Sequence, residues 1–221
     1  MSEVGAGVTD LVLGVVLFGC AAWLRRTQGV HRYWALTWWS AGAAAFAGTA
    51  HHLVFNHSRR ASDLSWVAVG VLIAVAISYL LAATAVVILD ERLARVVIRA
   101  RIAGLLAYAA VMGLVGIGRT EPLVLSESVT MAAIVGLWCY ALFIGRPGAA
   151  RVLVAIAVLA LSALFFALPA GIFPSGVGLD ARSLQHLGQI PGVLLLTQVV
   201  ASGALSTEDD GLAVSPARPT P

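Results

Sequence analysis

The sequence predicts an all-α membrane protein, a bundle of seven transmembrane helices, and three observations lead to this prediction. Of the 221 residues, 60% are hydrophobic and 11% are charged, and the mean hydropathy is +0.92. A soluble domain carries about a quarter charged residues, so this apolar excess would have no aqueous surface to cover it. The apolar residues form long continuous runs, which favours helices over the alternating strands of a membrane barrel. One span with its loop takes roughly 30 residues, so the length accommodates about seven.

Each predicted span is an apolar run bounded by arginine, aspartate, proline or glycine. The first has no basic region before it, so we interpret it as a span and not as a cleaved signal peptide. The second opens with Tyr33, Trp34, Trp38 and Trp39, which we interpret as an aromatic belt at the membrane interface. The predicted spans, in order, are 4–24, 33–55, 64–89, 102–118, 122–144, 152–173 and 183–205.

The later spans follow from the same pattern, with two local features. Arg99 and Arg101 crowd the start of 102–118, which makes it the weakest of the seven. Pro191 lies inside 183–205 and removes one backbone hydrogen bond, so we expect a kink there. Short connections make consecutive helices antiparallel neighbours in one domain, residues 1–205. Residues 206–221 are acidic and proline-rich, and we expect a disordered tail.

The arginines predict the orientation of this bundle. Loops on one side carry ten of them and loops on the other side carry four. Cytoplasmic loops hold the excess of basic residues, so the N-terminus is expected outside and the acidic tail in the cytoplasm. The composition favours a bacterial source, hence a bacterial cytoplasmic membrane. The larger group is Arg25, Arg26, Arg32, Arg92, Arg95, Arg99, Arg101, Arg146, Arg151 and Arg218, and the smaller is Arg59, Arg60, Arg119 and Arg182.

Composition also excludes several classes of protein. All 14 basic residues are arginine, so no lysine is present to form a retinal Schiff base or to act as a nucleophile. The arginines are dispersed over the loops, so the pI near 9.3 indicates topology and no nucleic-acid partner is expected. Cys20 and Cys139 lie in apolar runs without metal-ligand spacing, as small buried hydrophobic residues do.

Ionisable residues within spans are rare and costly, so each is a candidate for function. With the predicted orientation, most of them gather in the outer leaflet. His186 and Gln189 share one helix face just before Pro191, and Gly48 lies one turn before His52, leaving space beside that histidine. The polar residues of this leaflet are Asp10, His51, His52, His57, Asp63, Glu121, Glu127, Gln185, His186 and Gln189.

Imidazoles from two helices with a nearby carboxylate can bind Zn²⁺, and a zinc-bound water ionises near neutral pH. The reaction that follows most naturally in a membrane is hydrolysis of a lipid amide or ester. We expect His52 and His186 as the leading metal ligands, with His51 as a further one. Asp63 and Glu127 are the candidate catalytic carboxylates, and the surrounding polar residues are Gln185, Gln189, Asp10 and His57.

The span count, the outer N-terminus and three residues resemble the superfamily of alkaline ceramidases and progestin/adipoQ receptors, seven-span metal-dependent hydrolases. The residues are His52, Asp63 eleven positions later, and His186. The resemblance implies a zinc site of three histidines with the aspartate assisting the water. That family has two histidines four apart in its last span, whereas Arg182 and Ile190 flank His186 at this spacing. The third ligand is therefore left to His51, His57, Glu127 or Gln189.

Two other classes of function use the same residues. One is a ligand-binding protein or transporter with a polar cavity and no chemistry, although the sequence lacks the internal repeat of many transporters. The other is a haem protein with His52 and His186 as axial ligands; two-haem bundles need histidine pairs in both leaflets, and here His31 is the one histidine outside the outer set.

Overall fold

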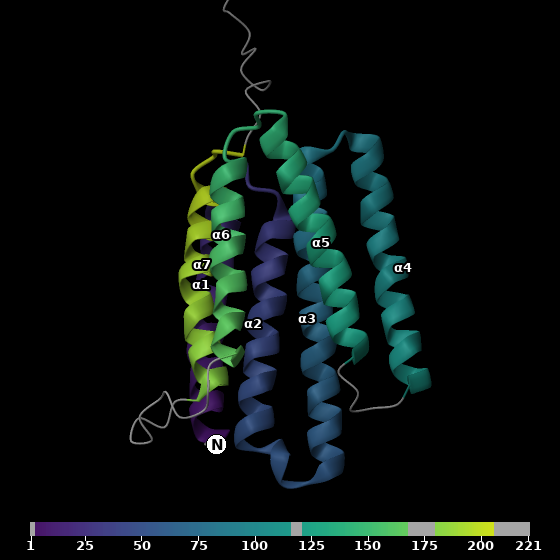
Figure 1. Ribbon diagram of the computed structural model, residues 1–221, viewed down its shortest axis with the longest axis vertical. Coiled ribbons are helices and arrows are strands. Elements are labelled where there is room, and N and C mark those ends of the chain that lie inside the picture. Colours follow the sequence, from purple (N-terminus) through teal and green to yellow (C-terminus); the bar gives the residue numbers. More distant parts are fainter. Residues whose placement is uncertain (1–2, 116–120, 168–179, 206–221) are drawn as a thin grey trace, which may run out of the picture.

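The computed structural model describes residues 3–115, 121–167 and 180–205, and every regular element in this part of the chain is a helix. Seven α-helices run alternately up and down, joined by short turns where the connections are described (Figure 1). The elements are α1 (Glu3–Arg26), α2 (Arg32–Leu53), η1 (Phe55–His57), α3 (Arg59–Ile88), α4 (Glu91–Val115), α5 (Glu121–Phe143), α6 (Ala149–Leu161), η2 (Ser162–Ala167) and α7 (Ala181–Ala201).

The seven predicted helices are all present. Most of their bounds lie within five residues of the prediction, and the two large differences are at the start of α4 and the end of α6. α4 begins at Glu91, not at 102. A helix can begin before its apolar stretch, and the arginines that precede this stretch have a high helix propensity. Asp90 supports this early start by accepting a hydrogen bond from the Leu93 N–H at 2.9 Å. α6 ends at Leu161 and continues as a 3-10 helix to Ala167. The rest of the predicted 152–173 span and the predicted tail lie outside the described residues.

Polar side chains cap the starts of three further helices. Ser58 accepts a hydrogen bond from the Ala61 N–H at the start of α3, and His31 accepts one from the Tyr33 N–H at the start of α2. Asp180 caps α7 through the Ser183 N–H at 3.0 Å and the Ser183 hydroxyl at 2.9 Å. The helix continues through Pro191 to Ala201, so the proline does not end it.

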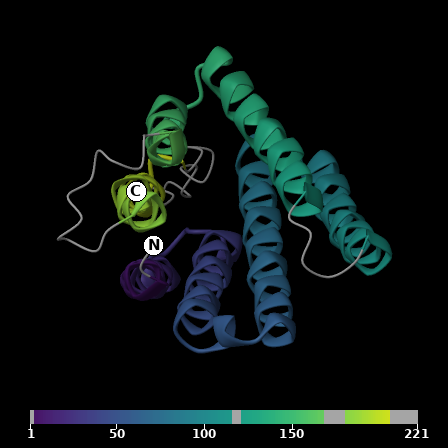
Figure 2. The ribbon, with the colours of Figure 1, turned by 60° about the horizontal axis from the view of Figure 1, so that its bottom comes forward.

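Six helices form a closed ring, and α4 lies outside it. Around the ring, α1 packs on α2, α2 on α3, α3 on α5, α5 on α6, α6 on α7, and α7 again on α1. α4 packs mainly on α3 and only sparsely on α5, at the edge of the molecule (Figures 1 and 2). The ring brings the first and last helices of the chain into contact, which positions the candidate site.

The interior of the ring holds three tryptophans among many alanines. Trp138 is fully buried and donates its indole N–H to Thr84, linking α5 to α3 at 3.1 Å. Trp34 and Trp38 are 2% and 5% exposed, so for them the predicted interface belt is wrong; only Trp39 of the tryptophans in this group is exposed. Small neighbours leave room for large rings in the core, and a sequence pattern does not distinguish such a tryptophan from one at an interface.

Within the described residues, three helices are long and apolar enough to cross a membrane: α1, α3 and α5. Many large apolar side chains also lie on the outside of the bundle, among them Leu106 and Leu114 on α4 and Phe143 on α5. An exposed apolar surface of this kind is typical of a protein that contacts lipid. The fold is therefore compatible with an integral membrane protein.

Candidate functional site

Four ionisable side chains meet where the start of α1, the end of α2 and the start of α7 come together, at the lower end of the bundle in Figure 1. They are Glu3 and Asp10 of α1, His52 of α2 and His186 of α7, and we call them the Asp10 cluster. Glu3 and Asp10 are seven residues apart, which places them on one face of α1. The closed ring thus joins residues from the two ends of the chain.

The carboxylate of Asp10 lies between the two imidazoles. Its Oδ1 is 3.0 Å from Nδ1 of His186, and its Oδ2 is 3.8 Å from Nε2 of His52. Asp10 and His52 are buried, at 6% and 4% exposure. The Thr9 hydroxyl is 3.5 Å from the same His186 nitrogen, and it also contacts the backbone carbonyls of Gly5 and Ala6. One acid therefore links histidines of two different helices.

Glu3 completes the cluster from the other side of His52. Its Oε2 is 2.6 Å from Nδ1 of His52, and its side chain is 46% exposed. Both ring nitrogens of His52 thus face carboxylate oxygens, which accept hydrogen bonds and cannot donate them. A neutral imidazole has a single N–H, so it could satisfy only one of these two contacts. Only the 2.6 Å contact with Glu3 is a hydrogen bond, because 3.8 Å exceeds hydrogen-bond length, and the two carboxylates together make the surroundings of His52 favourable for a cation.

Two glycines make room for this arrangement. A Cβ on Gly48 would lie 2.5 Å from Oδ2 of Asp10, closer than nonbonded atoms approach. A Cβ on Gly7 would meet the Leu53 side chain at 2.8 Å and Cβ of His52 at 3.4 Å. The sequence prediction that Gly48 leaves space beside His52 agrees with this geometry, and Asp10 occupies that space.

His51 points away from the cluster toward α3. Its Nδ1 is 2.8 Å from the Ser65 hydroxyl, and its ring packs against Trp66 with centroids 5.1 Å apart. Its ring lies nearly perpendicular to the His52 ring, with the centroids 5.0 Å apart. His51 therefore supports His52 from the side and directs its own hydrogen bond to another helix.

The other predicted site residues do not join the Asp10 cluster through any ion pair or hydrogen bond within the described part of the chain. Asp63 is half-buried on α3, and His57 is exposed in η1. Gln185 and Gln189 are half-buried on α7 beside His186. Glu127 lies on α5, which packs on α3, α4 and α6. The two carboxylates expected to be catalytic are therefore replaced at the histidines by Asp10 and Glu3.

Glu3 was missed by the sequence analysis and Asp10 was given a minor place. Glu3 precedes the apolar run, where an acidic residue is read as part of a solvated end. The signal that could have found it is the seven-residue spacing to Asp10 on one helix. That α1 packs on both α2 and α7 follows from the ring, which the local pattern does not show.

The donor set has the chemistry of a zinc site but is not arranged as one. Two imidazoles and a carboxylate are ligands that Zn²⁺ prefers, and His52 carries Glu3 on its second nitrogen, as metal-bound histidines usually carry a carboxylate. Among the described residues, however, no group of three or more His, Cys, Asp or Glu side chains is placed to hold a metal ion. The predicted set of His51, His52 and His186 is therefore not assembled as these side chains stand.

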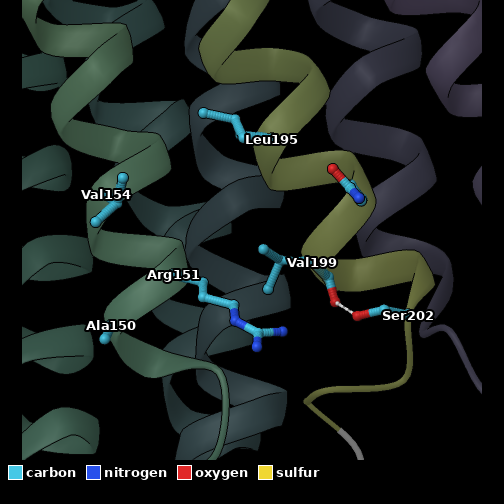
Figure 3. Close-up of a pocket in the computed structure, with 7 residues that line it drawn as sticks. Ala150, Arg151, Val154, Leu195, Val199 and Ser202 are labelled. Carbon is cyan, nitrogen blue, oxygen red and sulfur yellow. Dashed lines mark hydrogen bonds between the residues drawn. The ribbon is translucent and has the colours of Figure 1, made fainter.

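A cavity elsewhere contains none of the predicted site residues. It measures about 390 Å³ and lies between α6 and α7, where the Arg151 side chain extends toward Val199 and the Ser202 hydroxyl donates to the Val199 carbonyl (Figure 3). Its wall is mostly apolar, with Ala150, Val154 and Leu195. The Asp10 cluster is thus a packed group of side chains away from this space.

Comparison with known proteins places the chain in a family. The family model described as a family of unknown function, DUF6962, matches residues 6–204. The chain belongs to this family. The matched region includes Asp10, His52 and His186, and it begins after Glu3. No curated protein and no solved structure matches the chain.

Proposed function

We propose that this member of the family is an integral membrane hydrolase that cleaves a lipid amide or ester at the Asp10 cluster with the help of Zn²⁺. The observation that carries the proposal is the contact of one buried carboxylate with imidazole nitrogens from two other helices, at 3.0 and 3.8 Å. Asp10, His52 and His186 would hold the zinc after leaving their present mutual contacts, and the zinc would supply a water that ionises near neutral pH.

The charges of the cluster support a bound cation. Glu3 and Asp10 bring two carboxylates to two imidazoles, and Asp10 and His52 are buried. An uncompensated charge in a low-dielectric site is costly, so a proton or a metal ion stabilises the cluster. Glu3 has the role of holding the His52 ring in one orientation through Nδ1 and leaving Nε2 free to face Asp10.

The membrane setting supports a lipid substrate. We infer that all seven helices span the membrane, with the N-terminus outside and the C-terminus in the cytoplasm, and that the membrane is the cytoplasmic membrane of a bacterium. The Asp10 cluster then lies in the outer-leaflet half, where a lipid can reach it sideways between helices. The likeness of His52 and His186 to the histidines of the alkaline ceramidase superfamily supports the same class of reaction.

A second candidate function is ligand binding or transport without chemistry. It is favoured by the finding that, within the described residues, no set of three donors is placed to hold a metal. In this case a proton on each histidine would satisfy the contacts with Asp10 and Glu3, and the cluster would exchange protons or bind a cationic ligand.

Elemental analysis separates the two candidates. The protein is purified in detergent without chelators, and zinc and iron are measured for the wild type, Asp10→Asn, the double variant His52→Ala/His186→Ala, and His57→Ala as an exposed control. We expect about one zinc per chain in the wild type and control. Both cluster variants should lose it, together with hydrolysis of fluorogenic lipid amides and esters.

Two outcomes would contradict this proposal. Folded wild-type protein without metal, and with no gain of activity on adding zinc, would favour the binding or transport function. Iron with a Soret band would instead indicate a haem held by the same histidines.

A further inference from the structure

A second cavity lies between α3, α4 and α5, on the side of the molecule that α4 covers. Its volume is about 590 Å³, within the range of small-molecule sites. Along α5 it extends from Ser126 to Leu137, a helix length of about 16 Å. Its wall is mostly apolar, and among its lining residues are Ala74, Leu81, Val97, Leu105 and Ala133.

The charged residue of this wall is Arg101 of α4. Its Nη1 donates to the Ser78 hydroxyl at 3.4 Å, and its guanidinium lies over the rings of Tyr79 and Tyr33, at 4.4 and 5.5 Å from their centroids. Its Nε is buried and has no hydrogen-bond partner. The side chain is thus held in place by aromatic rings, with donor capacity left over.

Arg101 also lacks a counter-ion within the described residues, where no carboxylate forms an ion pair with it. Arg95 on the same helix differs, since it pairs with Glu91 at 3.1 Å on the surface. A partly buried cation without a counter-ion is costly, and an anionic group beside it would offset that cost. The cavity therefore combines an apolar length with one fixed positive charge.

We propose that this cavity binds an anionic phospholipid, with an acyl chain against its apolar wall and the phosphate at Arg101. Guanidinium and phosphate form strong charge-assisted hydrogen bonds. α4 lies at the edge of the bundle and packs only sparsely on α5, so a lipid reaches the cavity without passing through the ring. In the inferred orientation Arg101 begins the cytoplasmic end of its span, where anionic lipids gather.

The site is independent of the proposed hydrolase function. It shares no residue with the Asp10 cluster. Arg101 reaches α2 only at Tyr33, at the opposite end of that helix from His52. Lipid binding can therefore be tested whether or not the protein is an enzyme, and the readouts below do not depend on catalysis.

The test compares two lipids with identical acyl chains on the full-length protein in detergent. Phosphatidylglycerol is expected to raise the melting temperature by about 5 °C at saturation, whereas phosphatidylcholine has little effect. Arg101→Gln should weaken binding of phosphatidylglycerol, measured by native mass spectrometry, at least tenfold. The matched control is Arg99→Gln, which removes the same charge from an exposed position on the same helix.

A second pair of variants tests the acyl part of the site. Gly104 and Gly136 line the cavity, and a Cβ on either would meet no atom within 4 Å. Gly104→Leu and Gly136→Leu should therefore fill the cavity without disturbing the fold, and they should reduce lipid binding while leaving the lipid-free melting temperature the same or higher.

Three results would overturn the inference. Equal stabilisation by the two lipids would show that Arg101 selects no anion. Stabilisation by inorganic phosphate alone, matching that of the lipid, would show an anion site without an acyl site. Retained binding in both glycine variants would place the lipid elsewhere on the surface.

Discussion

At the scale of single residues, the site depends on how closely Asp10 approaches α2. The approach is open because position 48 is glycine, and the distance of 2.5 Å from a Cβ there to Asp10 Oδ2 leaves no room for alanine. The contact involves a charged group buried between helices. Moving it lowers the free energy of unfolding, because its partners are then left unpaired.

Gly48→Ala is therefore expected to destabilise the protein by about 1–3 kcal/mol, since α1 or the carboxylate must shift. The measurement is the melting temperature followed by tryptophan fluorescence. Gly19→Ala is the matched control, because a Cβ at that position in α1 meets no atom within 4 Å. Equal stability of Gly48→Ala and the wild type would contradict the close approach of Asp10.

His51 and His52 are neighbours in sequence with different surroundings. His51→Ala should keep any bound metal and activity, because its hydrogen bond goes to Ser65, and should lose about 1 kcal/mol of stability. His52→Ala should lose both the metal and the activity, because the His52 ring lies between Asp10 and Glu3 and contacts both carboxylates. Metal content and hydrolysis are compared at equal amounts of folded protein. Loss of metal in His51→Ala but not in His52→Ala would instead support His51 as a metal ligand.

At the scale of elements, the sequence predicted the helices better than their partners. Apolar runs located all seven helices, because each helix contains a long run of apolar residues that face the core or the outside of the bundle. The predicted start of α4 was too late, because the arginines before 102 mark the edge of the apolar run and not the start of the helix. The sequence pattern placed His52 and His186 at helix ends on the same side of the bundle. It did not show that Asp10 would lie between them, because that depends on α1 meeting both α2 and α7.

The cap of α7 also supports the site, because His186 lies less than two turns from the start of this helix. Burial alone would raise the pKa of Asp180, but hydrogen bonds from the Ser183 N–H and hydroxyl, with the nearby Arg182, lower it overall below its ordinary value. The carboxylate is therefore stabilised in the folded state. Its contribution is complete above about pH 3.9, the ordinary value, and is lost as the pH falls through the lowered pKa.

Asp180→Ala should cost about 1 kcal/mol at pH 7. The difference in melting temperature from the wild type should shrink as the pH is lowered below about 4, because the wild-type carboxylate then becomes protonated. Asp180→Asn, which keeps a capping oxygen, should lie between the two. A difference that stays constant down to pH 3 would contradict the assignment of Asp180 as a charged cap.

At the scale of the whole molecule, ring closure connects the fold to the function. Six helices enclose an alanine-rich core, and the contact between α7 and α1 closes the ring at the Asp10 cluster. α4 stands outside and covers the cavity at Arg101. The two candidate sites therefore occupy different parts of one architecture, one within the ring and one beside it.

The orientation of this ring in the membrane decides which leaflet each site faces, and cysteine labelling tests it. On a background of Cys20→Ala and Cys139→Ala, single cysteines replace Gln28, exposed between α1 and α2, and His57, exposed in η1 between α2 and α3. Intact cells are treated with a membrane-impermeant maleimide. We expect His57→Cys to react and Gln28→Cys to react only after lysis, because ten arginines mark the Gln28 side as cytoplasmic. The reverse pattern would invert the topology and move the Asp10 cluster to the inner leaflet, and labelling of both in intact cells would show that α2 does not span the membrane.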